Sequence, residues 1–425
     1  MFTENNFHFI GIGGIGMSGL ARILRASGKN ISGSDNEASP ITAKLKEEGI
    51  LVAFPQAAQN IPLATEVVIY TLAVKPDNLE MIEAKKRGLR ILSYPEALGE
   101  AIRSKKVIAV AGAHGKTTTT GLLISACLQA GEDISCLVGS NLKELNGVNA
   151  RVGKSDWFII EACEYKRAFL NFQPEILAIT NIEAEHLDYY KDLEDYVEAF
   201  LTLAKQSRKV VVDSREANMA EIQKMAKEFF DASEVAEEFS LQIPGNHNRK
   251  NAALAFKVCE VMGIDLLAAK KGIEKYSGAW RRFEYRGEFQ GAKVYDDYAH
   301  HPTEIAATLG AARERFPQSR IVIVYQQHQL DRATKMLHEL GKSFSDADIV
   351  VIPNIYFVRD EADSLSKISG EDIAAEIRAN GKEAYFTENF ENTITWLKQN
   401  ITTGDLLLIV GAGDVFHITE KLLKN

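Results

Sequence analysis

The chain has few cysteines and no long hydrophobic run. Only four of its 425 residues are cysteine, and no two of them form a C-x-x-C pair. This pattern predicts reduced thiols that pack as small apolar residues. No apolar run approaches the ~18 residues of a membrane span, and Met1 is followed by polar residues rather than by a secretory signal. We therefore expect a cytoplasmic protein with no membrane partner.

The sequence also lacks an excess of positive charge. Its 49 basic and 58 acidic residues give a formal net charge of −9. This balance argues against a nucleic-acid carrier and against a polybasic membrane binder. It does not exclude small anionic substrates, because a local cradle of donors acts at short range. The length predicts about three domains of ~150 residues each.

Strands and helices are expected to alternate, which is typical of α/β folds with parallel sheets. Strands are predicted at residues 7–12, 31–34, 66–72, 107–111, 157–160, 176–181, 210–213, 293–295, 321–325, 349–352 and 406–410. Helices are predicted at residues 17–27, 78–87, 118–128 and 219–238, and Gly28 is expected to cap the first of them. The polar segment 100–106 and the segment 277–286 are interpreted as linkers. We place the domains at 1–103, 104–280 and 281–425.

Residues 107–128 have the pattern of a strand, a glycine-rich loop and a helix. The backbone N–H groups of such a loop and the positive end of the helix face an anion, typically a nucleotide phosphate. Lys116 is positioned to reach the terminal phosphates, and the Thr117 hydroxyl is positioned to bind Mg²⁺. The usual motif has a glycine where Val110 stands, so a turn before an ordinary helix is the alternative. The candidate ATP-binding residues here are Gly112, Ala113, His114, Gly115, Lys116, Thr117 and Thr118.

A second glycine turn follows the first predicted strand. It satisfies G-x-G-x-x-G from Gly11 to Gly16 between a strand and a helix, and Asp35 lies 24 residues after Gly11. The pattern is typical of dinucleotide binding. It does not decide between NAD and a UDP-sugar, because either pyrophosphate fits a helix N-terminus. The candidate ligand-binding residues are Gly13, Gly14, Ile15, Gly16, Ser34 and Asp35.

Two further polar residues follow predicted strands of the central region. Glu161 comes directly after the strand at 157–160, and His186 follows the strand at 176–181. The carboxyl ends of parallel strands meet at one edge of a sheet, where ligands bind. Glu161, His186 and Thr117 are therefore candidate Mg²⁺ ligands. His186 also fits a structural role, because Mg²⁺ prefers oxygen donors.

Six sequence blocks carry a resemblance to a known family. They read HFIGIGGIGMSGLA, AVAGAHGKTTTT, TNIEAEHLDYY, GNHNRKN, WRRFEYRG and YDDYAHHP. In this order, over nearly the whole chain, they resemble the Mur ligases of peptidoglycan synthesis. Within the family they are most similar to the branch that joins UDP-N-acetylmuramate to L-alanine.

The resemblance implies an α/β fold with three domains. These are a Rossmann-like N-terminal domain that binds the UDP-sugar, a P-loop NTPase-like central domain that binds ATP, and a Rossmann-like C-terminal domain that closes over ATP and binds the amino acid. The catalytic residues that the resemblance implies are Lys116, Glu161, His186 and Arg282. The implied Mg²⁺ ligands are Thr117, Glu161 and His186. The implied ATP contacts are Asn248, Asn251, Arg282 and Asp297. His301, next to His300, and Arg332 are implied to contact the amino acid.

The sequence departs from the family pattern at several positions. Cys163 stands where a carboxylate is usual, and Glu185 stands where Asp is usual. The stretch between Asp213 and Gly245 is short and rich in charge. Gln329 replaces the first arginine of a His-Arg-x-x-Arg string, of which Arg332 remains. That change leaves the identity of the acceptor open.

The implied reaction is ATP-dependent amide formation between UDP-N-acetylmuramate and L-alanine through an acyl phosphate, by a monomer or a homodimer. It needs no protein nucleophile, and the sequence shows no Ser-His-Asp or Cys-His constellation. Three alternatives stay open: a ligase that attaches a recycled murein tripeptide, a nucleotide-binding regulatory subunit without ligase chemistry, and a nicotinamide-dependent oxidoreductase.

Overall fold

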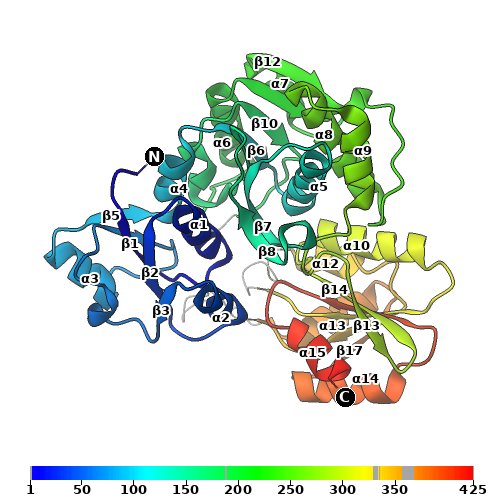
Figure 1. The fold of residues 1–425 in the computed structure, drawn as a ribbon. Coiled ribbons are helices and arrows are strands. Elements are labelled where there is room, and N and C mark those ends of the chain that lie inside the picture. The colour runs from blue at the N-terminus through cyan, green and yellow to red at the C-terminus, as the bar shows by residue number, and fades with distance from the viewer. Residues whose placement is uncertain (1, 187–188, 329–333, 335, 357–367, 425) are drawn as a thin grey trace. The chain divides into compact units, whose positions relative to one another are not determined.

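The computed structural model describes residues 2–186, 189–328, 334, 336–356 and 368–424. The described strands form three sheets, in which most neighbouring strands are parallel (Figure 1). This confirms the α/β fold class. The chain divides into two compact units, Met1–Ser240 with Lys250–Tyr276 and Leu241–Arg249 with Ser277–Asn425. Among the helices of the described residues, none combines the length and the apolarity needed to cross a bilayer.

The first sheet has five parallel strands in the order β3-β2-β1-β4-β5. Its strands are β1 (Asn6–Ile10), β2 (Asn30–Ser34), β3 (Leu51–Ala53), β4 (Val67–Tyr70) and β5 (Arg90–Ser93). Its helices are α1 (Ile15–Ala26), α2 (Pro40–Glu47), α3 (Leu79–Lys86) and α4 (Tyr94–Ile102), with the 3₁₀ turn η1 (Ala58–Asn60). Gly28 follows α1 with a φ of +83°, as expected for a left-handed cap. The predicted linker at 100–106 is wrong at its start, because α4 continues to Ile102.

The second sheet has seven strands in the order β12-β11-β10-β6-β9-β7-β8, and only β7 and β8 pair antiparallel. Its strands are β6 (Lys106–Ala111), β7 (Ser135–Leu142), β8 (Val148–Arg151), β9 (Trp157–Glu161), β10 (Ile176–Ile179), β11 (Lys209–Val212) and β12 (Glu228–Asp231). The accompanying helices are α5 (Lys116–Gln129), α6 (Leu193–Gln206), α7 (Met219–Met225), α8 (Asn246–Met262) and α9 (Leu266–Lys275). Three 3₁₀ turns are η2 (Lys143–Leu145), η3 (Tyr165–Asn171) and η4 (Ala232–Glu234).

The helix predicted at 219–238 is wrong. Only α7 is α-helical there, β12 then pairs in parallel with β11, and the 3₁₀ turn η4 follows. Phe229 and Phe230 lie in β12, beside Val210 and Val211 of β11. Aromatic residues favour a strand where a neighbouring strand is available, and this tertiary pairing outweighs the helical preference of the surrounding charged residues.

The first two sheets share one compact unit because α1 packs against β7 and β8 as well as against its own sheet. Asn149, at 0% exposure, donates from Nδ2 to the carbonyl of Ile15 (2.7 Å) and accepts from Arg22 (3.0 Å). Gly19 of α1 lies against Leu137 and Asn149. Satisfied polar contacts inside a continuous apolar core fix the two sheets to each other.

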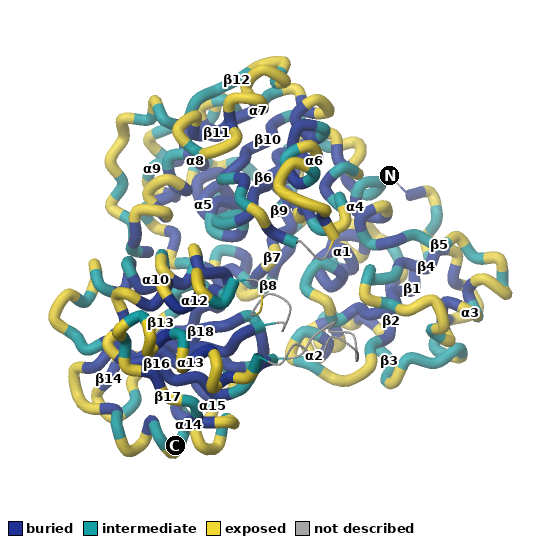
Figure 2. Tube along the Cα trace, turned by 180° about the vertical axis from the view of Figure 1, so that it is seen from behind, coloured by how far each residue is buried: buried dark blue, intermediate teal, exposed yellow. Residues whose placement is uncertain are grey.

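The third sheet has six strands in the order β13-β14-β18-β15-β16-β17, and only the β13–β14 hairpin is antiparallel. Its strands are β13 (Glu284–Phe289), β14 (Ala292–Asp297), β15 (Ile321–Tyr325), β16 (Ile349–Ile352), β17 (Glu383–Phe386) and β18 (Leu406–Val410). Its helices are α10 (Pro302–Arg315), α12 (Leu337–Lys342), α13 (Gly370–Ala379), α14 (Phe390–Asn400) and α15 (Phe416–Leu423). Separate apolar clusters cover its two faces, so the central strands are buried (Figure 2).

Candidate active site

The phosphate loop connects β6 to α5, as predicted. Gly115 precedes α5 with a φ of +84°, a conformation that glycine adopts at little cost. A side chain here would also collide with its surroundings, because a Cβ would lie 2.7 Å from Oδ1 of Asn251. Asn251 of α8, a predicted ATP contact, is thereby placed against the loop.

Asn181 shapes the loop and was not found by sequence reasoning. It accepts from the Ala113 N–H through its carbonyl (3.1 Å) and from the His114 N–H through Oδ1 (2.9 Å), and its Nδ2 donates to the His114 carbonyl (3.0 Å). Two loop amides therefore already have acceptors. The first amides of α5, at Lys116, Thr117 and Thr118, have no acceptor within a helix and are the donors that an anion would meet. The sequence signal that could have identified Asn181 is its position at the end of a predicted strand, because β10 pairs with β6 and both strands end at the same edge of the sheet.

Thr117 and Glu161 come together at the sheet edge, as predicted. The Thr117 hydroxyl donates to Oε1 of Glu161 (2.8 Å), and the Gly139 N–H donates to Oε2 (2.7 Å). A hydroxyl and a carboxylate oxygen form the hard donor set that Mg²⁺ prefers, so these residues fit the ion.

Lys116 and His186 both contact Glu164, which the sequence analysis did not single out. Lys116 Nζ donates to Oε1 of Glu164 (3.0 Å) and to the carbonyls of Gly112 (2.5 Å) and Ala113 (2.9 Å). His186 Nε2 lies 3.4 Å from the same Glu164 oxygen, and its ring packs against Tyr165. The role of His186 as a metal ligand stays a prediction.

The charges of this cluster stabilise one another. Burial disfavours ionisation of Glu164, but the Lys116 ammonium and the contact with His186 together outweigh it and lower the pKa of Glu164 to about 2. Burial likewise disfavours charged Lys116, but Glu164 and the other anionic groups around it, Glu161 among them, together outweigh burial and raise the pKa of Lys116. Cys163 is exposed, yet the protein packed around its thiol raises its pKa to about 12. Cys163 therefore stays protonated and is not an activated nucleophile.

The first glycine turn is held by Asp35, whose Oδ2 accepts from the Gly13 N–H (2.7 Å). Gly14 precedes α1, and the Ile15 carbonyl is bonded to Asn149. A Cβ on Gly16 would lie 2.6 Å from the Tyr94 hydroxyl oxygen, so this glycine allows close packing with α4.

Ser34 points away from the turn, into the interior. It is completely buried, and its hydroxyl donates to Oε2 of Glu80 (2.5 Å). The same buried carboxylate accepts from the Ala57 N–H (3.0 Å) and from Asn60 (2.9 Å), and it lies 3.3 Å from His8. In this structure Ser34 therefore has a structural contact rather than an accessible hydroxyl.

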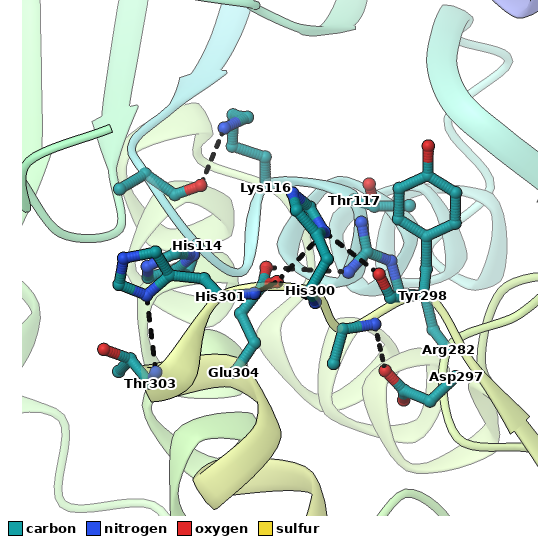
Figure 3. Close-up of polar contacts among 12 residues, drawn as sticks. His114, Lys116, Thr117, Arg282, Asp297, Tyr298, His300, His301, Thr303 and Glu304 are labelled. Atoms are coloured by element: carbon teal, nitrogen blue, oxygen red, sulfur yellow. Dashed lines mark hydrogen bonds and ion pairs between the residues drawn. The ribbon is translucent and has the colours of Figure 1, made fainter. Parts of the chain in front are cut away.

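In the carboxyl-terminal unit, Arg282 lies just before β13, and Asp297 is the last residue of β14 (Figure 3). The Arg282 guanidinium stacks over Tyr298 (5.2 Å) and lies 3.9 Å from Glu304. Asp297 accepts from the Phe283 N–H and the Ala299 N–H, at 2.7 Å each. These bonds order the β14 terminus, and burial raises the pKa of Asp297.

His301, the second of the paired histidines, caps α10. Thr303 N–H donates to His301 Nδ1 (3.3 Å), and the N–H groups of His300 and His301 donate to Glu304. Asn248, in the first turn of α8, donates to the Pro244 carbonyl (2.6 Å). Arg332 and Gln329 lie outside the described residues. The predicted amino-acid contacts stay predictions.

Comparisons with known proteins cover all three sheets. The profile described as "Mur ligase family, catalytic domain" matches residues 6–106, "Mur ligase middle domain" matches 110–230, and "Mur ligase, glutamate ligase domain" matches 281–413. The UDP-N-acetylmuramate–L-alanine ligase of Acetivibrio thermocellus is 39% identical over 98% of this chain and 95% of its own length. The enzyme of that name from Lachnospira eligens is 37% identical over 99% and 98%.

A solved structure is also similar. The crystal structure of UDP-N-acetylmuramate–alanine ligase from Thermotoga maritima matches with a TM-score of 0.85 at 27% identity, over 99% of this chain and 98% of that one. A murein peptide ligase from Psychrobacter arcticus matches with a TM-score of 0.73 at 24% identity, which reflects the shared fold. Sequence blocks, phosphate loop and whole-chain similarity agree, and the chain belongs to the Mur ligase family.

Proposed function

We propose that this protein is an ATP-dependent carbon–nitrogen ligase that joins L-alanine to UDP-N-acetylmuramate and releases ADP and phosphate. The observation that carries the proposal is the Thr117–Glu161 pair beside the phosphate loop (2.8 Å), in a chain that matches alanine ligases over nearly its full length. The loop supplies amides and a lysine for nucleotide phosphate. The paired oxygens supply a place for the cation that accompanies it.

In the proposed reaction, the lactyl carboxylate of the sugar attacks the γ-phosphate of ATP and gives an acyl phosphate and ADP. The amine of L-alanine then attacks the acyl carbon, and phosphate leaves from a tetrahedral intermediate. Lys116 and the first amides of α5 stabilise the charge that develops on the phosphoryl oxygens. Thr117 and Glu161, with His186, would hold Mg²⁺, which when bound neutralises phosphate charge. Two anions must meet in the first step, so this electrostatic stabilisation is essential.

The remaining predicted contacts complete the proposal. The turn from Gly13 to Gly16, with Asp35, receives the UDP-sugar; Ser34 would have to leave Glu80 to take part. The proposed ATP contacts are Arg282, Asp297, Asn248 and Asn251. The proposed amino-acid contacts are His301 and Arg332. The proposed domains are 1–103, 104–280 and 281–425. We propose that the enzyme acts in the cytoplasm as a monomer or a homodimer.

An omission experiment tests the function. Purified protein is supplied with ATP, Mg²⁺, UDP-N-acetylmuramate and L-alanine, and each component is left out in turn while phosphate release is followed and the product is weighed by mass spectrometry. We expect phosphate release only with all four, together with a UDP-sugar product heavier by one alanine residue. Binding of ATP without acceptor-dependent phosphate release would instead identify a regulatory subunit.

A further inference from the structure

Glu164 is a completely buried carboxylate that contacts two residues of the proposed reaction through one oxygen. Its Oε1 lies 3.0 Å from Lys116 Nζ and 3.4 Å from His186 Nε2. Its Oε2 is also buried. Burial and the Glu164 carboxylate together raise the pKa of the Tyr196 hydroxyl, which the carboxylate contacts. Removing a carboxylate from water costs free energy, which close polar partners such as Lys116 offset.

The backbone around Glu164 holds it rigidly. The Tyr190 hydroxyl donates to the Glu164 carbonyl (2.5 Å), and so does the Arg167 N–H (2.9 Å). Lys166 and Arg167, which follow, have φ values of +52° and +55°, so the chain turns sharply after Glu164. These constraints fix the position from which the carboxylate reaches Lys116 and His186.

We propose that Glu164 is a positioning residue of the ligase reaction, whose single oxygen Oε1 sets the place of Lys116 and the orientation of His186 together. Glu164 Oε1, with the carbonyls of Gly112 and Ala113, fixes the position of Lys116 Nζ. The same oxygen lies 3.4 Å from His186 Nε2 and orients that ring. Glu164 thus links the phosphate cradle on α5 to the loop after β10. This inference rests on the proposed function.

The proposal predicts a selective effect of Glu164→Gln. Loss of the charge leaves the shape of the side chain and misplaces both partners, so kcat falls by about 10–100-fold. The KM for UDP-N-acetylmuramate changes by less than about 2-fold, because Glu164 acts through its contacts with Lys116 and His186, whereas the proposed UDP-sugar turn is held by Asp35 and Asn149. Glu164→Asp keeps the charge with a shorter reach and should recover part of the loss.

A double-mutant cycle tests this linkage. The full-length wild type, Glu164→Gln, His186→Asn and the double variant are compared, with Glu198→Gln on the exposed face of α6 as the control. Turnover is expressed per nucleotide-binding site, so that a loss of folded protein does not count as a loss of rate. We expect the double variant to be no slower than the slower single variant, within about 2-fold, and the control to match the wild type.

Two results would overturn the proposal. One is a double variant whose loss of turnover equals the product of the losses in the two single variants. The other is a loss of turnover in Glu164→Gln that is explained by fewer nucleotide-binding sites. If Glu164→Gln does not fold, the cycle is run with Glu164→Asp. Absence of turnover in wild type with full nucleotide binding would contradict the proposed function instead. The linkage is then judged from ATP affinities of the same proteins, where the same non-additivity is expected.

Discussion

The hydroxyl of Thr117 donates a 2.8 Å hydrogen bond to Oε1 of Glu161 and so joins the first turn of α5 to the end of β9. Both oxygens are candidate Mg²⁺ ligands. Thr117→Val keeps the shape and removes the hydroxyl, and we expect the Mg²⁺ concentration for half-maximal rate to rise at least about 10-fold. Thr117→Ser, which keeps the hydroxyl, is the control. A magnesium titration of phosphate release measures both, and equal titrations would exclude Thr117 as a ligand.

Lys116 is expected to stabilise the transferred phosphoryl group. Lys116→Ala should lower turnover by about 10²–10³-fold or more, because a charged donor is lost where negative charge develops. The substitution also leaves the buried Glu164 carboxylate without its cation. The double variant Lys116→Ala/Glu164→Gln removes that charge and serves as the folding control in thermal unfolding. ADP release near the wild-type rate in a folded variant would rule out the phosphate-cradle assignment.

His186 has two possible roles that a metal titration separates. If it binds the cation, His186→Ala raises the Mg²⁺ requirement of turnover by about 10-fold or more. If it serves only the packing seen with Glu164 and Tyr165, the requirement is unchanged and thermal stability falls. We expect the first result. An unchanged titration would return His186 to a structural role.

Asp296 predicts a pH-dependent stability of the carboxyl-terminal unit. Burial raises its pKa to about 6, although Thr419 (2.7 Å) and Arg286 (3.1 Å) donate to it. The native state therefore holds the proton more tightly than the unfolded chain, whose aspartates titrate near ~3.9. The free energy of unfolding should fall, relative to that of Asp296→Asn, by about 2–3 kcal/mol between pH ~4 and ~6.

Tryptophan fluorescence measures this effect. Replacing Trp157 by Phe leaves Trp280 and Trp396, both in the carboxyl-terminal unit, as the reporters of its unfolding. Urea unfolding of the wild-type and Asp296→Asn proteins, both carrying Trp157→Phe, is compared between pH ~4 and ~6. Parallel pH dependences of wild type and Asp296→Asn would contradict a raised pKa at Asp296.

The sequence predicts those parts of the site that depend on local spacing. Both glycine turns lie between a strand and a helix as expected, because glycine placement and capping act over a few residues. Thr117 meets Glu161 because parallel strands end at a common edge, a rule that applies without knowledge of side-chain packing.

The parts that depend on tertiary packing could not be predicted. Whether Ser34 faces the turn or the interior depends on Glu80, 46 residues away. The pairing of Glu164 with Lys116 depends on a turn after β9 that no periodicity signals. The strand β12 forms because β11 offers an edge, which the composition of residues 219–238 does not reveal.

The identity of the acceptor is the most direct test of the account. Phosphate release should be measured with ATP and UDP-N-acetylmuramate against each amino acid and against the murein tripeptide, and kcat/KM compared. The account predicts that L-alanine gives the highest value and that the tripeptide is at or near background. A higher kcat/KM for the tripeptide than for L-alanine would contradict it.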